Sequence, residues 1–532
     1  MRRRQFLSLV ASGLGAGALG WWLWNPRQRP EIPGRIVGAS AAAGHRLRRG
    51  DFPAPTARRR TSVVILGAGV SGLSAAWKLA GSGLDDFLVL ELEAEPGGNS
   101  RSGHYGPSAC PWGAHYLPVP TREARATRQL LEEMGCLRLG PDGEPRYDET
   151  QLCHDPQERL FLHGRWQEGL FPALGASEED FAQLRAFQNH VQRWRERRDS
   201  RGRKAFAIPL DLSSPEWSCL DSLSMAEYLD RQGWNSPRLR WYVEYGCRDD
   251  YGTTLATTSA WAGLHYFASR DGGGFSDPEA LLTWPEGNAR LVAALASRAR
   301  GRVLGGALVF RVHIQDRGVE VDYLDLTTGQ ATRVSARRAV YALPVFTRPH
   351  LLGQERLAGF TWCPWAVANL VVRRTPTGEG APLSWDNVIY DSPSLGYVVA
   401  THQSLASRTG PSVLTWYRSF PGPPARERQA MLERDWKGWR DLVLGDLARA
   451  HPDIADTVER LDVMLWGHAM VRPLPGLIWG AARQAARQPL GPLHFAHSDL
   501  SGLSIFEEAQ YQGVRAAQEV LKALHHPFQD SL

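Results

Sequence analysis

The sequence predicts an α/β fold in which a domain built on a parallel sheet carries an inserted α+β domain. A nearly continuous apolar run at 62–66, a helical pattern at 70–80 and a second apolar run at 87–90 together make a βαβ unit. Short strand patterns return within 302–345, and a helical pattern with small residues on one face lies at 507–524. With 532 residues, the chain is long enough for two intertwined domains.

The two predicted domains alternate along the chain, behind a leader and a linker rich in Arg, Pro and Ala. We expect the leader at 1–43, the linker at 44–60, the parallel-sheet domain at 61–120, 281–345 and 471–525, and the inserted domain at 121–280, where it is mainly helical, and at 346–470, where sheet and helices mix.

The N-terminus has the pattern of a targeting segment. Arg3-Arg4-Gln5-Phe6-Leu7 matches the twin-arginine motif, and an apolar stretch rich in Gly and Ala follows to residue 24. This stretch is short for a spanning helix, which needs ~20 apolar residues, and a small-residue cleavage site, Ala39-Ser40-Ala41, follows it. We therefore expect export by the twin-arginine route, to the periplasm in a bacterium with two membranes. The alternative is an uncleaved leader that anchors the protein, with the tryptophans of 21–24 at the membrane interface.

Charge and cysteine content exclude several classes of function. The chain has 61 Lys and Arg against 56 Asp and Glu, and 12 of the arginines precede residue 61, so the remainder is close to neutral. No nucleic-acid partner is expected from this balance. The six cysteines form no CxxC pair, which gives no reason to expect a zinc site or a disulfide scaffold.

A glycine motif directly follows the first predicted strand. In Gly67-Ala68-Gly69-Val70-Ser71-Gly72, Gly67 permits a tight turn, Gly69 lets the backbone approach a pyrophosphate, and Gly72 lets the helix pack on the strand. The helix that begins here presents free N–H groups to phosphates. Glu91 ends the second strand, where an acid accepts hydrogen bonds from ribose hydroxyls. The unit therefore predicts a Rossmann-like dinucleotide site that disfavours a 2′-phosphate.

A second glycine segment, Gly97-Gly98-Asn99-Ser100-Arg101, follows Glu91 closely. It would bring another stretch of backbone over the pyrophosphate, which favours FAD over NAD. The alternative is an ordinary turn, since paired glycines often mark one.

With these motifs the sequence resembles the flavin amine oxidase superfamily, which includes monoamine and polyamine oxidases, protoporphyrinogen oxidase and carotenoid desaturases. The resemblance lies in VVILGAGVSGLSAA (63–76), VLELEAEPGGNSRSG (89–103), PWGAHYLP (111–118) and HFAHSDLSGLSIFEEAQYQGVRAA (494–517). It implies FAD contacts from Gly113, from the backbone of Val309 at the adenine, and from Asp499. The chain departs from the family at Ala496-His497-Ser498-Asp499, where relatives have Ala-Gly-Asp or Ala-Gly-Glu, so Ser498 is an alternative to Asp499. Since no cysteine follows Cys363, the FAD is expected to be non-covalent.

Side chains for the reaction are harder to assign. His115 falls where the family's chain passes the flavin ring, and it either orients substrate or is a buried structural histidine. Asp249-Asp250 either binds a cationic amine or ends a helix. His468 is a further pocket candidate. The last helix, if it points at the flavin, would stabilise negative charge on the reduced ring.

The resemblance implies an enzyme that takes a hydride from a C–N or C–C bond of a small organic molecule to flavin N5. Oxygen or a quinone would then accept the electrons. Two alternatives stay open. One is a dehydrogenase or desaturase of an isoprenoid or porphyrin-like substrate, which would need a wide apolar tunnel. The other is a flavin-bearing binding or assembly protein whose redox activity is incidental.

Overall fold

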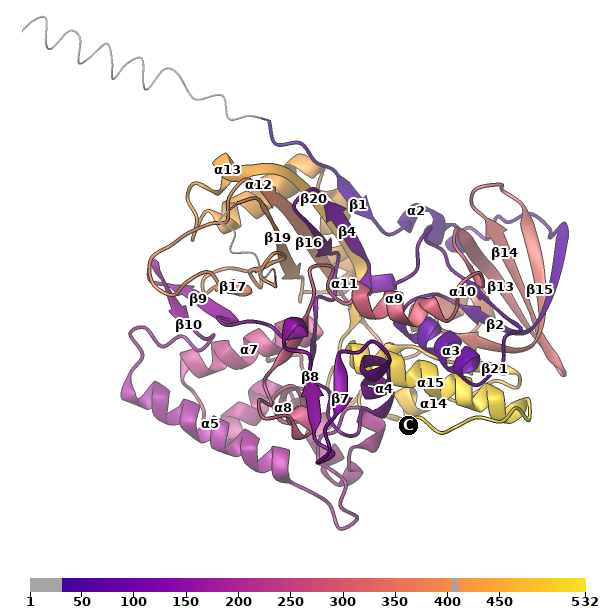
Figure 1. Ribbon diagram of the computed structural model, residues 1–532, viewed down its shortest axis with the longest axis horizontal. Helices are drawn as coiled ribbons and strands as arrows, with labels where there is room; N and C mark the ends of the chain where they lie inside the picture. The colour runs from indigo at the N-terminus through magenta and orange to yellow at the C-terminus, as the bar shows by residue number, and fades with distance from the viewer. Residues whose placement is uncertain (1–30, 404–409) are drawn as a thin grey trace, which may run out of the picture.

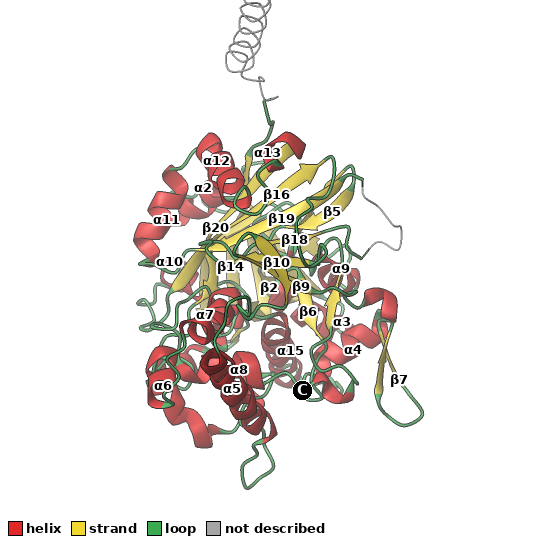
Figure 2. Ribbon diagram, turned by 90° about the vertical axis from the view of Figure 1, so that its left-hand side faces the viewer, coloured by secondary structure: helices red, strands yellow, loops and turns green. Residues whose placement is uncertain are grey.

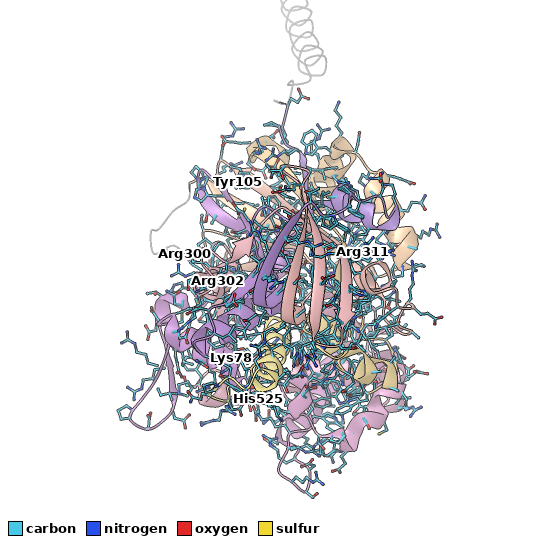
Figure 3. The ribbon with its side chains drawn as sticks, turned by 90° about the vertical axis from the view of Figure 1, so that its right-hand side faces the viewer. Lys78, Tyr105, Arg300, Arg302, Arg311 and His525 are labelled. Carbon is cyan, nitrogen blue, oxygen red and sulfur yellow. The ribbon has the colours of Figure 1, made fainter. Side chains whose placement is uncertain are left out.

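The computed structural model describes residues 31–403 and 410–532, which contain two large sheets (Figure 1). The first sheet has the strand order β12-β3-β2-β15-β14-β13, and β21 also pairs with β15. Its bounds are β2 Ala57–Leu66, β3 Phe87–Leu90, β12 Val303–Leu304, β13 Ala307–Gln315, β14 Gly318–Asp325, β15 Ala331–Tyr341 and β21 Leu493–Phe495. Arg302 and Arg311 mark its two opposite edges (Figure 3). The strands β12, β3, β2, β15 and β21 pair in parallel, so the predicted Rossmann-like α/β domain is confirmed.

Helices cover this sheet because its strands are apolar on both faces. The helix α3 (Val70–Gly81) follows β2, and α9 (Ala289–Ser297) and α15 (Phe506–Ala523) pack beside it. A Cβ at Gly513 of α15 would lie 2.1 Å from the backbone oxygen of Ser71, so a glycine is required where α15 crosses α3. The predicted small face of the last helix therefore serves close packing against the helix of the glycine motif.

The second sheet has the order β1-β20-β16-β19-β18-β17-β9-β10. Its bounds are β1 Ile36–Gly38, β9 Glu158–Leu162, β10 Arg165–Glu168, β16 Trp362–Val372, β17 Asp386–Ile389, β18 Tyr397–Val399, β19 Ser412–Ser419 and β20 Val458–Val471. Alternate residues of β16 enter two separate cores. Ala366 and Ala368 pack towards α12 (Trp436–Leu447), whereas Trp365 and Val367 lie on the opposite face. This period of two places the ring of Trp365 on the side that faces the interior of the molecule.

A helical layer lies next to the face of the second sheet that carries Trp365; it is below this sheet in Figures 1 and 2. Its helices are α5 Glu178–Glu196, α6 Met225–Arg231, α7 Pro237–Tyr251 and α8 Ala260–Ala268. Ser177 and Ser224 begin α5 and α6 with capping boxes, which satisfy the first free N–H groups of each helix. Smaller elements complete the chain: α2 Ala41–Gly44, β4 Ser102–Tyr105, β5 Ser108–Pro111, β6 Tyr116–Pro118, α4 Arg125–Glu133, β7 Leu137–Leu139, β8 Pro145–Tyr147, β11 Leu281–Thr283, α10 Arg348–Leu352, α11 Pro424–Glu433, α13 Ile454–Thr457 and α14 Ala481–Ala486.

Two strands begin within the ranges predicted as leader and linker. β1 lies inside the predicted leader (1–43) and pairs in parallel with β20, while β2 begins inside the predicted linker (44–60). The ends of the leader and the linker stay predictions. Strand β1 is too short and too exposed to show in an apolar pattern, and its pairing is made to a strand more than 400 residues away. The predicted cut site Ala39-Ser40-Ala41 follows β1 and ends on the first residue of α2.

The twin-arginine motif and the apolar stretch lie outside the described residues. Within 31–403 and 410–532, no helix is long and apolar enough to cross a membrane. All six cysteines are free, and no group of three or more His, Cys, Asp or Glu side chains in the described ranges is arranged to hold a metal ion.

Candidate functional site

The glycine motif forms a tight turn between β2 and α3. Gly67 has φ +93°, and its N–H donates to the Leu90 oxygen at 2.8 Å. A Cβ at Gly72 would lie 1.9 Å from the Gly67 oxygen, whereas a Cβ at Gly69 would meet nothing within 4 Å. Gly67 and Gly72 are therefore needed for the turn and the packing, and Gly69 borders open space at the start of α3, where a phosphate would fit.

The second glycine segment lies against the first, as the prediction of an FAD site requires. Gly97 and Gly98 have φ values of +130° and +55°. The Gly97 N–H donates to the Ala68 oxygen at 2.8 Å, and a Cβ at Gly98 would lie 3.3 Å from the Gly69 Cα. Two stretches of backbone thus frame the open space, and the buried Ser71 and Ser100 flank them.

The Glu91 carboxylate holds the glycine turn in place by accepting hydrogen bonds from two backbone N–H groups. Its Oε2 accepts the Ala68 N–H at 2.6 Å and its Oε1 accepts the Glu93 N–H at 3.0 Å. Burial raises the pKa of this carboxyl, and the two backbone donors oppose that shift. Glu91 therefore shapes the glycine turn, and its contact with a ribose stays a prediction.

Arg101 supplies a positive charge with unused donors. Its Nη1 donates to Glu93 Oε2 at 3.2 Å, and its guanidinium lies 5.4 Å from the centre of the Trp466 ring. Its Nε and Nη2 are buried and have no protein partner. Buried guanidinium donors are normally paired, and a planar pair of N–H groups matches a phosphate. This orphaned pair fits the diphosphate of FAD.

The next segment brings the backbone to the edge of a cavity. A Cβ at Gly113 would lie 2.2 Å from the Asn99 oxygen, which also accepts the Ala114 N–H at 3.1 Å. The Asn99 side chain donates to the Ala469 oxygen at 2.6 Å and so ties the loop to the end of β20. The predicted residues Asn99 and Gly113 therefore belong to one wall.

Two other predicted cofactor residues lie in different surroundings. Val309 is buried in β13, opposite Tyr323 and just before an irregularity in the strand pairing. Asp499 is buried, and its Oδ2 accepts the Val345 N–H at 2.9 Å and Trp362 Nε1 at 3.1 Å. Burial would raise the pKa of Asp499, but His497 and these donors lower it overall. Their contacts with FAD stay predictions.

A cavity lies between the two domains, where the second sheet, the helical layer and the start of α15 meet. Its walls come from the β5–β6 loop, the end of α7, strands β16, β19 and β20, and the start of α15. The lining residues are Asn99, Gly113, Ala114, His115, Tyr116, Pro118, Asp249, Asp250, Arg270, Asn288, Trp365, Val367, Tyr417, Trp466, Ala469, Met470, Ser504, Ile505, Phe506 and Glu507. The predicted residues Asn99, Gly113 and His115 and the first turn of α15 therefore share one cavity.

Two aromatic rings form parallel walls in this cavity. Trp365 on β16 and Tyr417 on β19 have ring centres 6.5 Å apart and planes only 4° from parallel. The Tyr417 hydroxyl donates to Asp386 Oδ1 at 3.2 Å, which fixes the orientation of its ring. The sequence analysis missed this pair, because 52 residues separate the two side chains and nothing local distinguishes them from other core aromatics.

An acidic pair faces the same space. Asp249 and Asp250 lie in the last turn of α7, which ends at Gly252 in the left-handed conformation. The Tyr116 hydroxyl donates to Asp249 Oδ2 at 3.2 Å. Burial and the neighbouring Asp250 raise the pKa of Asp249 to about 7, and burial raises the pKa of Asp250 to about 6. The pair therefore ends a helix, as one interpretation expected, and also lines the cavity; its binding of a cationic amine stays a prediction.

An ion pair between Arg270 and Glu507 lies beside the acidic pair. Arg270 Nη1 donates to Glu507 Oε1 at 3.1 Å, in the first turn of α15. The negative charges of Glu507 and Asp250 raise the pKa of Arg270 despite its burial. The cavity thus holds three carboxyl groups and one guanidinium.

His115 lines the cavity as a neutral imidazole. Its Nδ1 lies 3.0 Å from the Gly113 oxygen, and its ring contacts those of Tyr116 and Tyr417, with centres 5.2 and 5.0 Å away. Burial lowers its pKa to about 4. His468 does not line the cavity; it stacks on Phe346 with ring centres 4.2 Å apart.

Comparisons with known proteins agree with a flavin-binding fold. The family model of flavin-containing amine oxidoreductases matches residues 70–521. "Oxidoreductase PigB" of Serratia is 23% identical over 86% of this chain and 74% of its own length. A "Baeyer-Villiger monooxygenase" of Pseudomonas aeruginosa is 43% identical over 184 residues, which are 29% of this chain and 34% of that protein. A double mutant of putrescine oxidase superposes with a TM-score of 0.66 at 17% identity, covering 87% of this chain and 100% of that one, which shows a shared fold.

Proposed function

Because the chain belongs to the family of flavin-containing amine oxidoreductases, we propose that it oxidises a small cationic amine in the cavity between its two domains. The family makes the protein an FAD-dependent oxidoreductase. The amine as substrate, the hydride transfer and the place of action are the proposed parts.

The cofactor site agrees with FAD held without a covalent bond. Bound FAD would supply the acceptor for a hydride from the carbon next to the substrate nitrogen. Arg101 would hold the diphosphate with its two unpartnered donors, and the start of α3 would present its N–H groups to the same phosphates. No cysteine lines the cavity, which supports non-covalent binding.

The observation that carries the proposal is the pairing of aromatic walls with carboxylates in one cavity. Trp365 and Tyr417 present parallel ring faces, which attract a cation and exclude water. Asp249 and Asp250 supply negative charge beside them. A protonated amine is complementary to both features, and its carbon substituents would lie against the aromatic rings that line the cavity.

Asp249 also suits the removal of a proton. A hydride leaves the carbon of a neutral amine more readily than that of an ammonium ion, because the nitrogen lone pair stabilises the positive charge that develops. With a pKa of about 7, the Asp249 carboxylate can accept that proton near neutral pH. The Tyr116 hydroxyl, 3.2 Å away, would stabilise the carboxylate form by hydrogen bonding.

The first turn of α15 has a role towards the ring system. Its N-cap Ile505 and its first residues, Phe506 and Glu507, line the cavity, so the positive end of the helix dipole faces it. This would stabilise negative charge on a reduced acceptor. Glu507 does not cancel the effect, since Arg270 pairs with it.

We further propose that the enzyme is exported through the twin-arginine route, which carries folded proteins, and passes its electrons to oxygen or a membrane quinone. The motif at 3–7 supports this proposal. The alternative of an isoprenoid or porphyrin-like substrate would need an apolar tunnel, and the four charged side chains in the lining weigh against it.

The test is an absorbance spectrum of the purified protein, followed by anaerobic mixing with amines and with apolar alkenes. We expect a flavin spectrum, FAD released on heating, and bleaching by amines alone. A protein that stays colourless with added FAD would refute the cofactor assignment. Bleaching by alkenes and by no amine would refute the substrate assignment while leaving the flavin in place.

A further inference from the structure

The segment 32–48, defined here as the N-terminal strap, is first held by the second sheet. β1 pairs with residues 463–465 of β20, and the Arg35 N–H donates to Asp462 Oδ1 at 3.0 Å. A Cβ at Gly34 would lie 1.8 Å from the Leu461 oxygen. The strap therefore docks at a contact so close that only glycine fits.

The strap then crosses to the dinucleotide-binding domain (indigo in Figure 1). The Ser40 N–H donates to Glu93 Oε1 at 2.7 Å, and its hydroxyl donates to Glu93 Oε2 at 3.0 Å. Farther along, Leu47 packs against the same core cluster as Leu92, which includes Leu308 and Phe310 of β13. Both anchors lie on the segment that follows β3, directly after Glu91.

Glu93 links the strap to the phosphate-binding arginine. The Oε2 atom that accepts the Ser40 hydroxyl also accepts Arg101 Nη1 at 3.2 Å. The side chains of Glu93 and Arg101 are 14% and 16% exposed, so this pair is largely shielded from water. The remaining donors of Arg101, Nε and Nη2, are the buried ones without a partner.

We infer that the N-terminal strap is a component of the FAD site, in which Ser40 is a positioning residue that fixes Glu93 and thereby the guanidinium of Arg101. The inference rests on the FAD assignment made above. A long side chain loses much conformational freedom when it binds, and a side chain held in place beforehand loses less. Because the strap is docked on the second sheet, it also joins the two domains across the site.

Two glycines of the strap provide a matched test in the full-length protein. Gly34→Val forces the strap away from β20, whereas Gly38→Val, four residues further on in β1, adds its side chain where nothing lies within 4 Å. Neither residue contacts Arg101 or the glycine motif. The measurement is the Kd of FAD, obtained by fluorescence titration of the apoprotein, together with the temperature at which flavin is released.

We expect the Kd of FAD to rise about tenfold in Gly34→Val and to stay within twofold of the unmodified protein in Gly38→Val. Flavin release should occur at a lower temperature in Gly34→Val, while its circular dichroism shows a folded chain. A Kd for Gly34→Val within twofold of the unmodified protein would overturn the inference.

If Gly34→Val does not fold, Ser40→Ala tests whether Ser40 positions Glu93 and Arg101. This variant removes only the hydroxyl donor to Glu93, and a rise of threefold or more in the Kd of FAD would support the positioning role. An unchanged Kd would overturn it. The unmodified protein in the same titration reports on the FAD assignment itself, so the two conclusions fail separately.

Discussion

The proton affinity of a carboxyl group depends on its surroundings, and Asp249 lies in surroundings that raise it. The pair 249–250 can be recognised in the sequence, but neighbouring acids in a chain often end a helix in full contact with water. Here the helix ends at a cavity, and burial raises the pKa of Asp249 to about 7. This change turns an ordinary helix end into a group that exchanges a proton near neutral pH.

A first prediction concerns the pH dependence of kcat/KM. A base with a pKa of about 7 is deprotonated above that pH, so kcat/KM for an amine should rise with pH through about 7. In Asp249→Asn this rise should disappear, with a fall of ~100-fold in kcat/KM at neutral pH, the size typical of losing a proton acceptor. The measurement is the initial rate from pH 5 to pH 9.

The matched control for this prediction is Asp230→Asn, which alters an exposed acid that pairs with Arg240 on the protein surface. Its pH profile should equal that of the unmodified enzyme. An unchanged profile in Asp249→Asn would assign the proton transfer to another group.

At the scale of elements, α15 connects two parts of the proposed mechanism. Its first turn lines the cavity, and its middle crosses α3, which begins at the glycine motif. The crossing is close because Gly513 has no side chain. The same packing that stabilises the domain thus sets the distance between the cavity and the phosphate-binding loop.

A second prediction follows for that crossing. Gly513→Ala places a Cβ 2.1 Å from the Ser71 oxygen, so the helices must separate. We expect the free energy of unfolding to fall by ~2 kcal/mol, the size seen for overpacked cores. Thermal unfolding followed by circular dichroism measures it.

Gly445→Ala is the control for this substitution. Gly445 lies in the helix α12 and its added Cβ would meet nothing within 4 Å. The free energy of unfolding should rise slightly, by up to ~1 kcal/mol, because alanine favours a helix more than glycine does. Equal effects of both substitutions would show that α15 and α3 do not press together at Gly513.

At the scale of the whole molecule, the two domains enclose the cavity only together. The aromatic walls come from the second sheet, the acidic pair from the helical layer, and Asn99 and the first turn of α15 from the dinucleotide-binding domain. The N-terminal strap connects the second sheet, through β20, to the segment that follows β3 of the first sheet.

A third prediction concerns maturation. Cleavage at Ala39-Ser40-Ala41 would separate β1 from the chain and break the contact of Ser40 with Glu93. We therefore expect the mature N-terminus to lie before Ile32, whose side chain is buried beneath the second sheet. N-terminal sequencing of the protein purified from its native cells measures this, and a terminus at residue 42 would contradict it.

The FAD-binding half of the protein could be predicted from the sequence because its signals are local. The turn at Gly67 and Gly72, the apolar strands and the acid at position 91 lie within thirty residues, so a short stretch of sequence contains all of them. Periodicity also predicted the last helix. The α/β class, the family and the enzyme class followed from these motifs.

The cavity proposed to bind the substrate could not be predicted from the sequence, because the tertiary structure brings its walls together. Trp365 and Tyr417 become parallel walls only through the pairing of β16 with β19, and Asp249 acquires its raised pKa only where α7 meets the cavity. The strap was missed for the same reason, since β1 is defined by a partner strand at the other end of the chain. Local geometry is written in short stretches of sequence, whereas the burial and charge of a site depend on which distant segments the fold brings together.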